Sequence, residues 1–205
     1  MTALLAPTYF GPVQWYQKLN RYDTVLVERH ETFQKQTYRN RCLIATANGV
    51  QALSVPVTPP GKGGNNAEAL VSDHGNWRHV HCNALKSAYG ESPFFEYYAD
   101  DLLPFFKEKW ETLFDFNLAI CRKMCELLDI QPNIQLTDHY ITADEAAQRG
   151  MDDYRRAINP KSPLADEQFV PRRYYQVYEQ RHGFIANLSI LDLLFNMGNE
   201  SVLWL

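Results

Sequence analysis

The chain has 205 residues, of which 45% are hydrophobic and 21% are charged, and its formal net charge at pH 7 is −4. This length and composition predict one folded domain spanning residues 1–205 and exclude disorder over most of the chain. The acidic balance argues against nucleic acid as a partner, because phosphate binding needs a basic field.

The first third of the chain predicts a β-α-β unit followed by a hairpin. The apolar run at residues 3–6 predicts a buried strand, Pro12 opens a helix to about residue 20, and residues 24–27 predict a second buried strand. Residues 42–46 and 51–57 are β-rich and flank Asn48-Gly49, a strong hairpin signal. The glycine-rich segment 58–66 lacks the spacing of a phosphate-binding motif, so we favour a lid or a linker.

The rest of the chain alternates helical and extended patterns. Helices are predicted at residues 76–89, 92–97, 107–128 and 188–196, the last capped by Asn187. Strands are predicted at 134–136 and 174–178, and the polar stretch 142–166 reads as a surface excursion. Together these elements predict a three-layer α/β fold with a mainly parallel sheet, flanking helices and one β-hairpin extension.

The location of the protein follows from what the sequence does not contain. No apolar run approaches the roughly 20 residues of a membrane span, and no signal-like segment opens the chain. The four cysteines have the spacing of ordinary packing residues and not of a disulfide scaffold. We therefore expect a cytoplasmic protein without a membrane span.

Asp192 interrupts a helix that is apolar nearly all round. Such a helix is buried, and a buried carboxylate must be paired or hydrogen-bonded. Two interpretations stay open: a structural ion pair with an arginine such as Arg39 or Arg41, or a functional carboxylate that faces a cleft. The other arginine is then suited to grip an anionic ligand.

His81 is the second polar residue in an apolar setting. It shares a helix face with Trp77, Leu85 and Ala88, so it is either a core histidine or a general acid or base. His79 and Cys82 lie nearby, but their spacing does not suit a zinc site, and we predict no metal ligands there.

Several motifs resemble the WbqC-like protein family, and the resemblance spans nearly the whole chain. The motifs are Ala6-Pro7-Thr8-Tyr9-Phe10-Gly11-Pro12 with Tyr16 and Asp23, Phe33-Gln34-Lys35, Tyr38-Arg39-Asn40-Arg41, Trp77-x-x-x-His81 with Tyr89 and Pro93-Phe94-Phe95, and Asn187-Leu-Ser-Ile-Leu-Asp192-Leu-Leu-Phe-Asn196-x-Gly198. The sequence departs from the family around residues 152–171, and at Thr8 and Gly11.

What the resemblance implies is a biological context more than a reaction. Family members are encoded among bacterial genes for O-antigen and other surface-polysaccharide synthesis, which implies a role in modified-sugar biosynthesis. Carried onto this sequence, the family's motif positions are Lys35, Asn40, Arg41, His81, Tyr89, Asn187, Ser189 and Asp192.

The resulting hypothesis is a group-transfer enzyme acting on a nucleotide-activated sugar or a related small metabolite. Its cleft is expected at the carboxyl ends of the parallel strands. The expected roles divide the motif positions: Lys35 and Arg41 hold an anionic portion, His81 or Asp192 moves a proton, Asn187 and Ser189 offer donors at the start of the last helix, and Asn40 and Tyr89 contact the ligand.

Other classes of function compete with the enzyme. One is a non-catalytic small-molecule-binding or accessory protein of the same pathway, and another is an interaction protein that uses exposed aromatic residues. The opening also has a fold-level analogy to nucleotidyltransferases, but no histidine lies between Met1 and Arg29 to supply their His-x-Gly-His motif. Cofactor and oligomeric state stay open.

Overall fold

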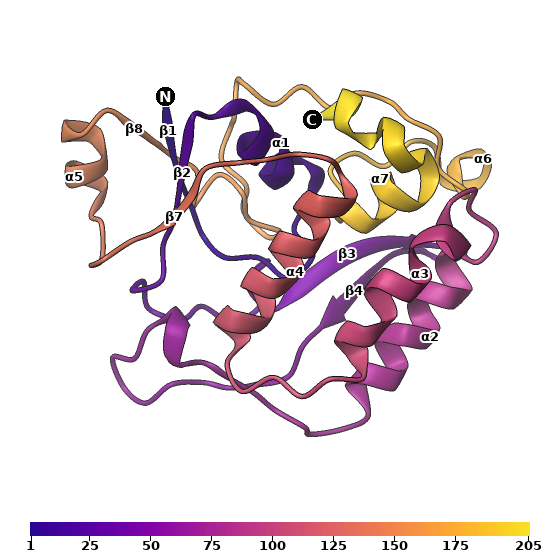
Figure 1. The fold of residues 1–205 in the computed structure, drawn as a ribbon, viewed down its shortest axis with the longest axis horizontal. Helices are drawn as coiled ribbons and strands as arrows, with labels where there is room; N and C mark the ends of the chain where they lie inside the picture. The colour runs from indigo at the N-terminus through magenta and orange to yellow at the C-terminus, as the bar shows by residue number, and fades with distance from the viewer.

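A four-stranded parallel sheet organises the chain, and a computed structural model describes all of residues 1–205 (Figure 1). The strands are β1 (Thr2–Leu5), β2 (Thr24–Val27), β7 (Ile134–Leu136) and β8 (Met151–Asp153), in the order β7-β2-β1-β8. All three pairings are parallel. The strands predicted at 24–27 and 134–136 are confirmed at the same bounds, and the opening strand is shifted by one residue.

The sheet is covered on both faces, as the predicted three layers require. Successive side chains of a strand point to opposite faces of the sheet, so they pack in two different cores. Leu4 and Leu26 pack with Ile141 and with Ala146 of α5 (Ala143–Gln148). The residues between them, Ala3, Leu5, Val25 and Val27, join the main core with α1 (Val13–Arg21). Figure 1 shows the strands between α5 at the far left and α1.

The predicted hairpin forms a separate two-stranded sheet. Strands β3 (Arg41–Thr46) and β4 (Gly49–Ser54) pair in antiparallel register across a turn in which Gly49 has φ +103°. Glycine adopts this left-handed region without strain. The short strands β5 (Val57–Thr58) and β6 (Leu70–Val71) form a second antiparallel pair around the glycine-rich loop.

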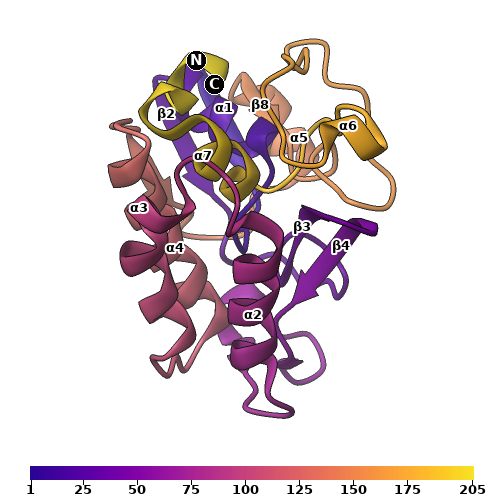
Figure 2. The same ribbon diagram turned by 90° about the vertical axis from the view of Figure 1, so that its right-hand side faces the viewer.

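Three helices lie on one side of the hairpin, as the turned view shows (Figure 2): α2 (Trp77–Tyr89), α3 (Phe95–Leu102) and α4 (Leu113–Leu127). The predicted start of the long helix at residue 107 is wrong. The amide of Leu113 donates to Ala69 O and the amide of Val71 donates to Glu111 O, so this segment pairs with β6. The Thr112 side chain then caps α4 by accepting from the Asp115 amide.

Two other predictions in the last third of the chain are corrected. Strand β8 lies within the stretch predicted as a surface excursion. Its sequence Met-Asp-Asp is polar because it is an edge strand that pairs only with β1. The strand predicted at 174–178 is absent: Tyr174 and Gln176 are buried and Tyr175 is exposed, but no neighbouring strand pairs with them.

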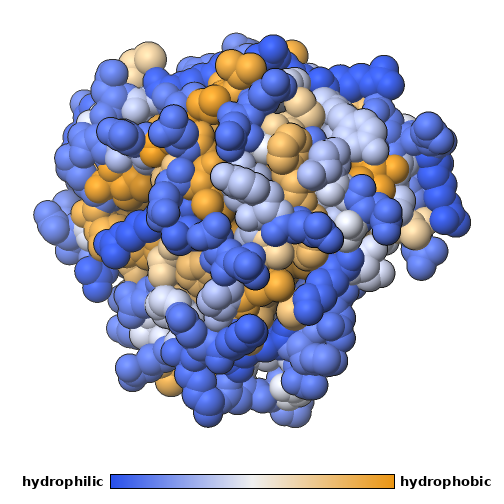
Figure 3. Space-filling model, turned by 45° about the vertical axis from the view of Figure 1, so that its right-hand side comes forward, coloured by the Kyte–Doolittle hydropathy of each residue, from blue (hydrophilic) through white to orange (hydrophobic).

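The chain ends in α6 (Glu179–His182), the buried helix α7 (Ile190–Met197) and a 3-10 helix over Gly198–Trp204. Burial of nearly all of α7 is as the sequence predicts. Figure 3 shows a mainly hydrophilic face that is interrupted by hydrophobic patches. No helix combines the length and the apolar character that crossing a membrane requires.

Candidate functional site

A polar cavity opens where three of the parallel strands end. Its volume is about 500 Å³, and the residues that line it come from the segments that follow β2 and β7, from α5, and from the end of β8. The lining residues are His30, Glu31, Thr32, Gln34, Tyr140, Ala143, Asp153, Arg155 and Arg156. Ligands of α/β proteins usually bind outside the carboxyl ends of the strands, and this cavity has that position.

The fully buried carboxylate of Glu28 holds these segments together. Its Oε1 accepts hydrogen bonds from the His30 amide (2.7 Å) and the Thr137 hydroxyl (2.9 Å). Its Oε2 accepts from the Ile141 amide (3.0 Å) and from Arg155 Nη1 (3.5 Å). A buried carboxylate is stable when its oxygens are satisfied in this way. One side chain therefore fixes the positions of the segments after β2, β7 and β8.

Arg155 and Arg156 differ in what surrounds them. Arg155 is buried, and its Nε and Nη2 donate to the two carboxylate oxygens of Asp153 at 2.9 and 2.6 Å. Its guanidinium carbon lies 5.4 Å from the centre of the Tyr140 ring. Arg156 is exposed and forms no ion pair with any carboxylate of the chain. Arg156 therefore presents an uncompensated positive charge to the cavity.

His30 is the imidazole side chain of this cavity. Its Nε2 lies 3.0 Å from the carbonyl oxygen of Thr137. Because a carbonyl oxygen only accepts, the contact assigns the proton of the neutral ring to Nε2. Nδ1 then carries a free lone pair and has no hydrogen-bond partner in the chain. This is the arrangement of a general base whose orientation the protein fixes.

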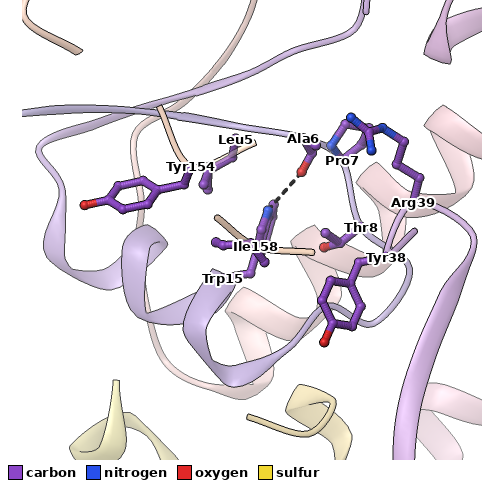
Figure 4. Close-up of a pocket in the computed structure, with 9 residues that line it drawn as sticks. All are labelled: Leu5, Ala6, Pro7, Thr8, Trp15, Tyr38, Arg39, Tyr154 and Ile158. Carbon is purple, nitrogen blue, oxygen red and sulfur yellow. Dashed lines mark hydrogen bonds between the residues drawn. The ribbon is translucent and has the colours of Figure 1, made fainter. Parts of the chain in front are cut away.

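A second, narrow pocket lies at the end of β1, where the chain order of the strands changes direction (Figure 4). Trp15 lines it and donates from Nε1 to Ala6 O at 2.9 Å. Arg39, which lines this pocket, forms an ion pair with Glu31 of the polar cavity. The two spaces are therefore neighbours, joined through that pair.

Asp192 lies apart from the polar cavity, in a buried hydrogen-bond network. It accepts from the Tyr89 hydroxyl at 2.9 Å, the Tyr174 hydroxyl at 2.7 Å and Gln176 Nε2 at 2.8 Å. Burial raises the pKa of Asp192, and these three hydrogen bonds oppose that shift. Of the two interpretations left open, the ion pair with an arginine is wrong, because uncharged donors satisfy the carboxylate.

His81 is enclosed by the core. Its Nδ1 lies 2.8 Å from the Tyr9 hydroxyl, and its ring packs against Trp77 and Phe106. Burial lowers the pKa of His81 to about 4, although a hydrogen bond with the Ser54 backbone acts in the opposite direction. The ring is therefore neutral at pH 7. It does not line the polar cavity.

Asn187 and Ser189 connect α1 with α7, the last α-helix of the chain. Asn187 Oδ1 accepts from the Gln14 amide at 2.9 Å, so it caps α1 and not the helix that follows it. The Ser189 hydroxyl donates to Phe10 O at 2.8 Å and accepts from the Leu191 amide, which caps α7. These polar groups are engaged within the chain.

The remaining predicted residues lie around the start of the hairpin. Asn40 is buried and donates from Nδ2 to Val55 O at 3.0 Å, and Arg41 is the half-buried first residue of β3. Lys35 is exposed and directly follows Gln34, a cavity residue. The structure therefore joins Tyr89 to Asp192 and leaves Lys35 next in sequence to a cavity residue, but it does not bring the eight predicted residues into one site.

Sequence reasoning missed His30 and Tyr140, which line the cavity, and Glu28, which supports it, and it marked Arg155 and Arg156 only as a pair of neighbouring arginines. A signal for them was present in part: polar and charged side chains directly follow the apolar strands that end at Val27 and Leu136. No cluster of three or more histidine, cysteine, aspartate or glutamate side chains has the geometry of a metal site.

Comparison with known proteins identifies the family. The model of the WbqC-like protein family matches residues 6–203. An uncharacterised protein of Mycobacterium tuberculosis, Rv1507c, is 27% identical over 212 residues, which cover 94% of this chain and 89% of the relative. No solved structure matches significantly. Since the family model covers almost the entire chain, the protein belongs to the WbqC-like protein family.

Proposed function

We propose that this protein is a group-transfer enzyme that acts on a nucleotide-activated sugar or a related anionic metabolite in surface-polysaccharide synthesis. One observation carries the proposal: the polar cavity at the strand ends is lined both by an unpaired arginine, Arg156, and by an oriented histidine, His30. An arginine binds phosphate or carboxylate through two parallel hydrogen bonds. Lys35, which directly follows the cavity residue Gln34 on the segment after β2, is a second exposed cation.

His30 supplies the proton transfer in this proposal. A hydroxyl or amine of the acceptor gives its proton to Nδ1 as its oxygen or nitrogen bonds to the transferred group. The bond between that group and its phosphate or other leaving group breaks in the same step, and Arg156 stabilises the charge that develops on the leaving group. The contact with Thr137 O keeps the imidazole in the required tautomer, and Glu28 fixes the positions of both residues by accepting from the His30 amide and the Thr137 hydroxyl.

Substitution of the two residues separates binding from chemistry. Arg156→Gln is expected to weaken binding of UDP-glucose or ADP-glucose about tenfold or more, the size of a hydrogen bond to a charged group. His30→Gln is expected to keep affinity within about twofold and to lower turnover by about 10²–10⁴-fold. Calorimetry gives affinity, and mass spectrometry of nucleotide release with acceptor panels gives turnover.

The matched control is Arg181→Gln, which removes an exposed arginine that forms no ion pair and lies outside the cavity. The control protein should bind and react like the unmodified protein. If Arg156→Gln binds nucleotide sugars as tightly as the unmodified protein does, the binding site lies elsewhere. Binding that depends on Arg156 without any turnover in the unmodified protein would make this a binding protein and contradict the enzyme.

A further inference from the structure

Tyr140 is the aromatic side chain of the polar cavity, and it is backed by a cation. The residue is 47% exposed and lines the cavity. The guanidinium of Arg155 lies 5.4 Å from its ring centre. Arg155 cannot easily move away, because it donates twice to Asp153 and lies 3.5 Å from a Glu28 oxygen. The ring is thus held on a fixed support while its exposed part faces the cavity.

The cation behind the ring decides what stacks well on it. An aromatic face is normally negative, and sugar C–H groups bind to that negative face. A guanidinium on one side draws π-electron density toward itself and leaves the opposite side less negative. A nucleobase, whose own π-electrons repel a negative ring face, stacks better on such a surface than a sugar ring does. Tyr140 is therefore better suited to a base than to a pyranose.

The charges around Tyr140 leave one position for a phosphate. Glu31 and Asp153 also line the cavity, but Glu31 is paired with Arg39 and Asp153 with Arg155. Arg156 is the lining cation without a partner, and it directly follows the arginine that supports Tyr140. The stacking surface and the free cation therefore line the same cavity, as the base and the phosphate of one bound nucleotide require.

We propose that Tyr140 is the nucleobase platform of the cavity, so that the nucleotide is the part of the ligand that this protein recognises, with its phosphate at Arg156. The inference rests on the proposed function, since it concerns the same cavity. Thr32 and Gln34, which line the cavity, supply hydrogen-bonding groups for the ribose. Tyr140 is then the residue that separates nucleotides from simple sugar phosphates.

A pair of ligands that differ only in the base tests the proposal. AMP or UMP is compared with ribose 5-phosphate by calorimetry, on the unmodified protein and on Tyr140→Leu. The nucleotide is expected to bind about tenfold more tightly than ribose 5-phosphate, and Tyr140→Leu to remove about that factor, the size of one base stacked on an aromatic ring. Ribose 5-phosphate should bind both proteins equally, and Tyr140→Phe should keep the preference.

Tyr175→Leu is the matched control, because Tyr175 is 53% exposed and lies outside the cavity. Equal affinities for nucleotide and ribose 5-phosphate would overturn the proposal, as would an equal loss of both in Tyr140→Leu. If phosphate binding depends on Arg156 but not on Tyr140, the platform is wrong while the proposed function stands. If neither nucleotides nor nucleotide sugars bind, both fail together.

Discussion

The two residues that stand out most in the sequence, His81 and Asp192, are both buried and both satisfied by neutral partners. Tyr9 contacts the imidazole, and Tyr89, Tyr174 and Gln176 donate to the carboxylate. Such networks are costly to break, because a donor left without its acceptor cannot turn to water. The apolar setting that made these residues conspicuous is what keeps them away from an open cavity.

The lowered pKa of His81 makes the free energy of unfolding depend on pH. Burial lowers that pKa to about 4 in the folded protein, whereas an unfolded histidine titrates near 6.5. The unfolded chain therefore binds more protons between these values, and the free energy of unfolding falls as pH drops from about 6.5 to 4. The loss is about 3 kcal/mol.

Urea denaturation at several pH values measures this dependence, with His81→Gln as the variant. Its unfolding free energy should vary less over the same window, whatever its absolute value. His79→Gln is the control, because His79 is exposed and should leave the slope intact. An unchanged slope in His81→Gln would contradict the assignment.

Among elements, the irregular segment 160–172 is fixed to α1 by a buried ion pair. Lys18 Nζ lies 2.8 Å from Asp166 Oδ2, and both side chains are almost fully buried. Gln14 donates to the same oxygen at 2.8 Å. Burial tends to raise the pKa of Asp166, but Lys18 and Gln14 outweigh it and hold the pKa below its usual value.

Breaking this pair on one side leaves a buried charge uncompensated. Asp166→Asn is therefore expected to lower the free energy of unfolding by about 3–5 kcal/mol at pH 7, whereas Lys18→Met with Asp166→Leu should cost much less. The carboxylate stabilises the fold above its unfolded pKa, so the difference between the unmodified protein and Asp166→Asn should shrink as pH falls below about 4. A double variant as unstable as the single one would refute the ion-pair account.

The elements also show where sequence patterns succeed. Residues 24–27 and 134–136 are predicted at their observed bounds because the β-branched, apolar run Thr-Val-Leu-Val and the alternating Ile-Gln-Leu favour strands by local preference. β8 is missed because its stability comes from pairing with β1, and α4 starts late because β6 captures the residues before it. The cavity is missed for the same reason: its segments meet only through the strand order β7-β2-β1-β8, which no local pattern encodes.

Across the whole molecule, the first and last long helices cap each other's starts. Asn187 and Leu188 accept from the first two amides of α1, and the Ile190 amide of α7 donates to Gly11 O. Segments more than 170 residues apart along the chain thus complete one another. The N-terminal helix therefore depends on the end of the chain for its hydrogen bonds.

Two substitutions at Asn187 separate the contribution of its helix cap from that of its left-handed backbone conformation. Asn187 has φ +56°, a left-handed conformation that glycine adopts freely and alanine does not. Asn187→Gly should lose only the cap, about 1 kcal/mol of unfolding free energy. Asn187→Ala should lose about 1–2 kcal/mol more. Thermal and urea unfolding measure both, and an alanine variant more stable than the glycine variant would contradict this account.

The carboxylate of Glu28 has a consequence for how the chain tolerates insertions. Its four hydrogen bonds reach His30, Thr137, Ile141 and Arg155, which fixes the number of residues between each strand end and its contact. A single added residue within those short spans would misalign the donors of all the segments. Length differences among relatives should therefore fall beyond those four residues, where each segment is free to grow and to reshape the cavity for a different ligand.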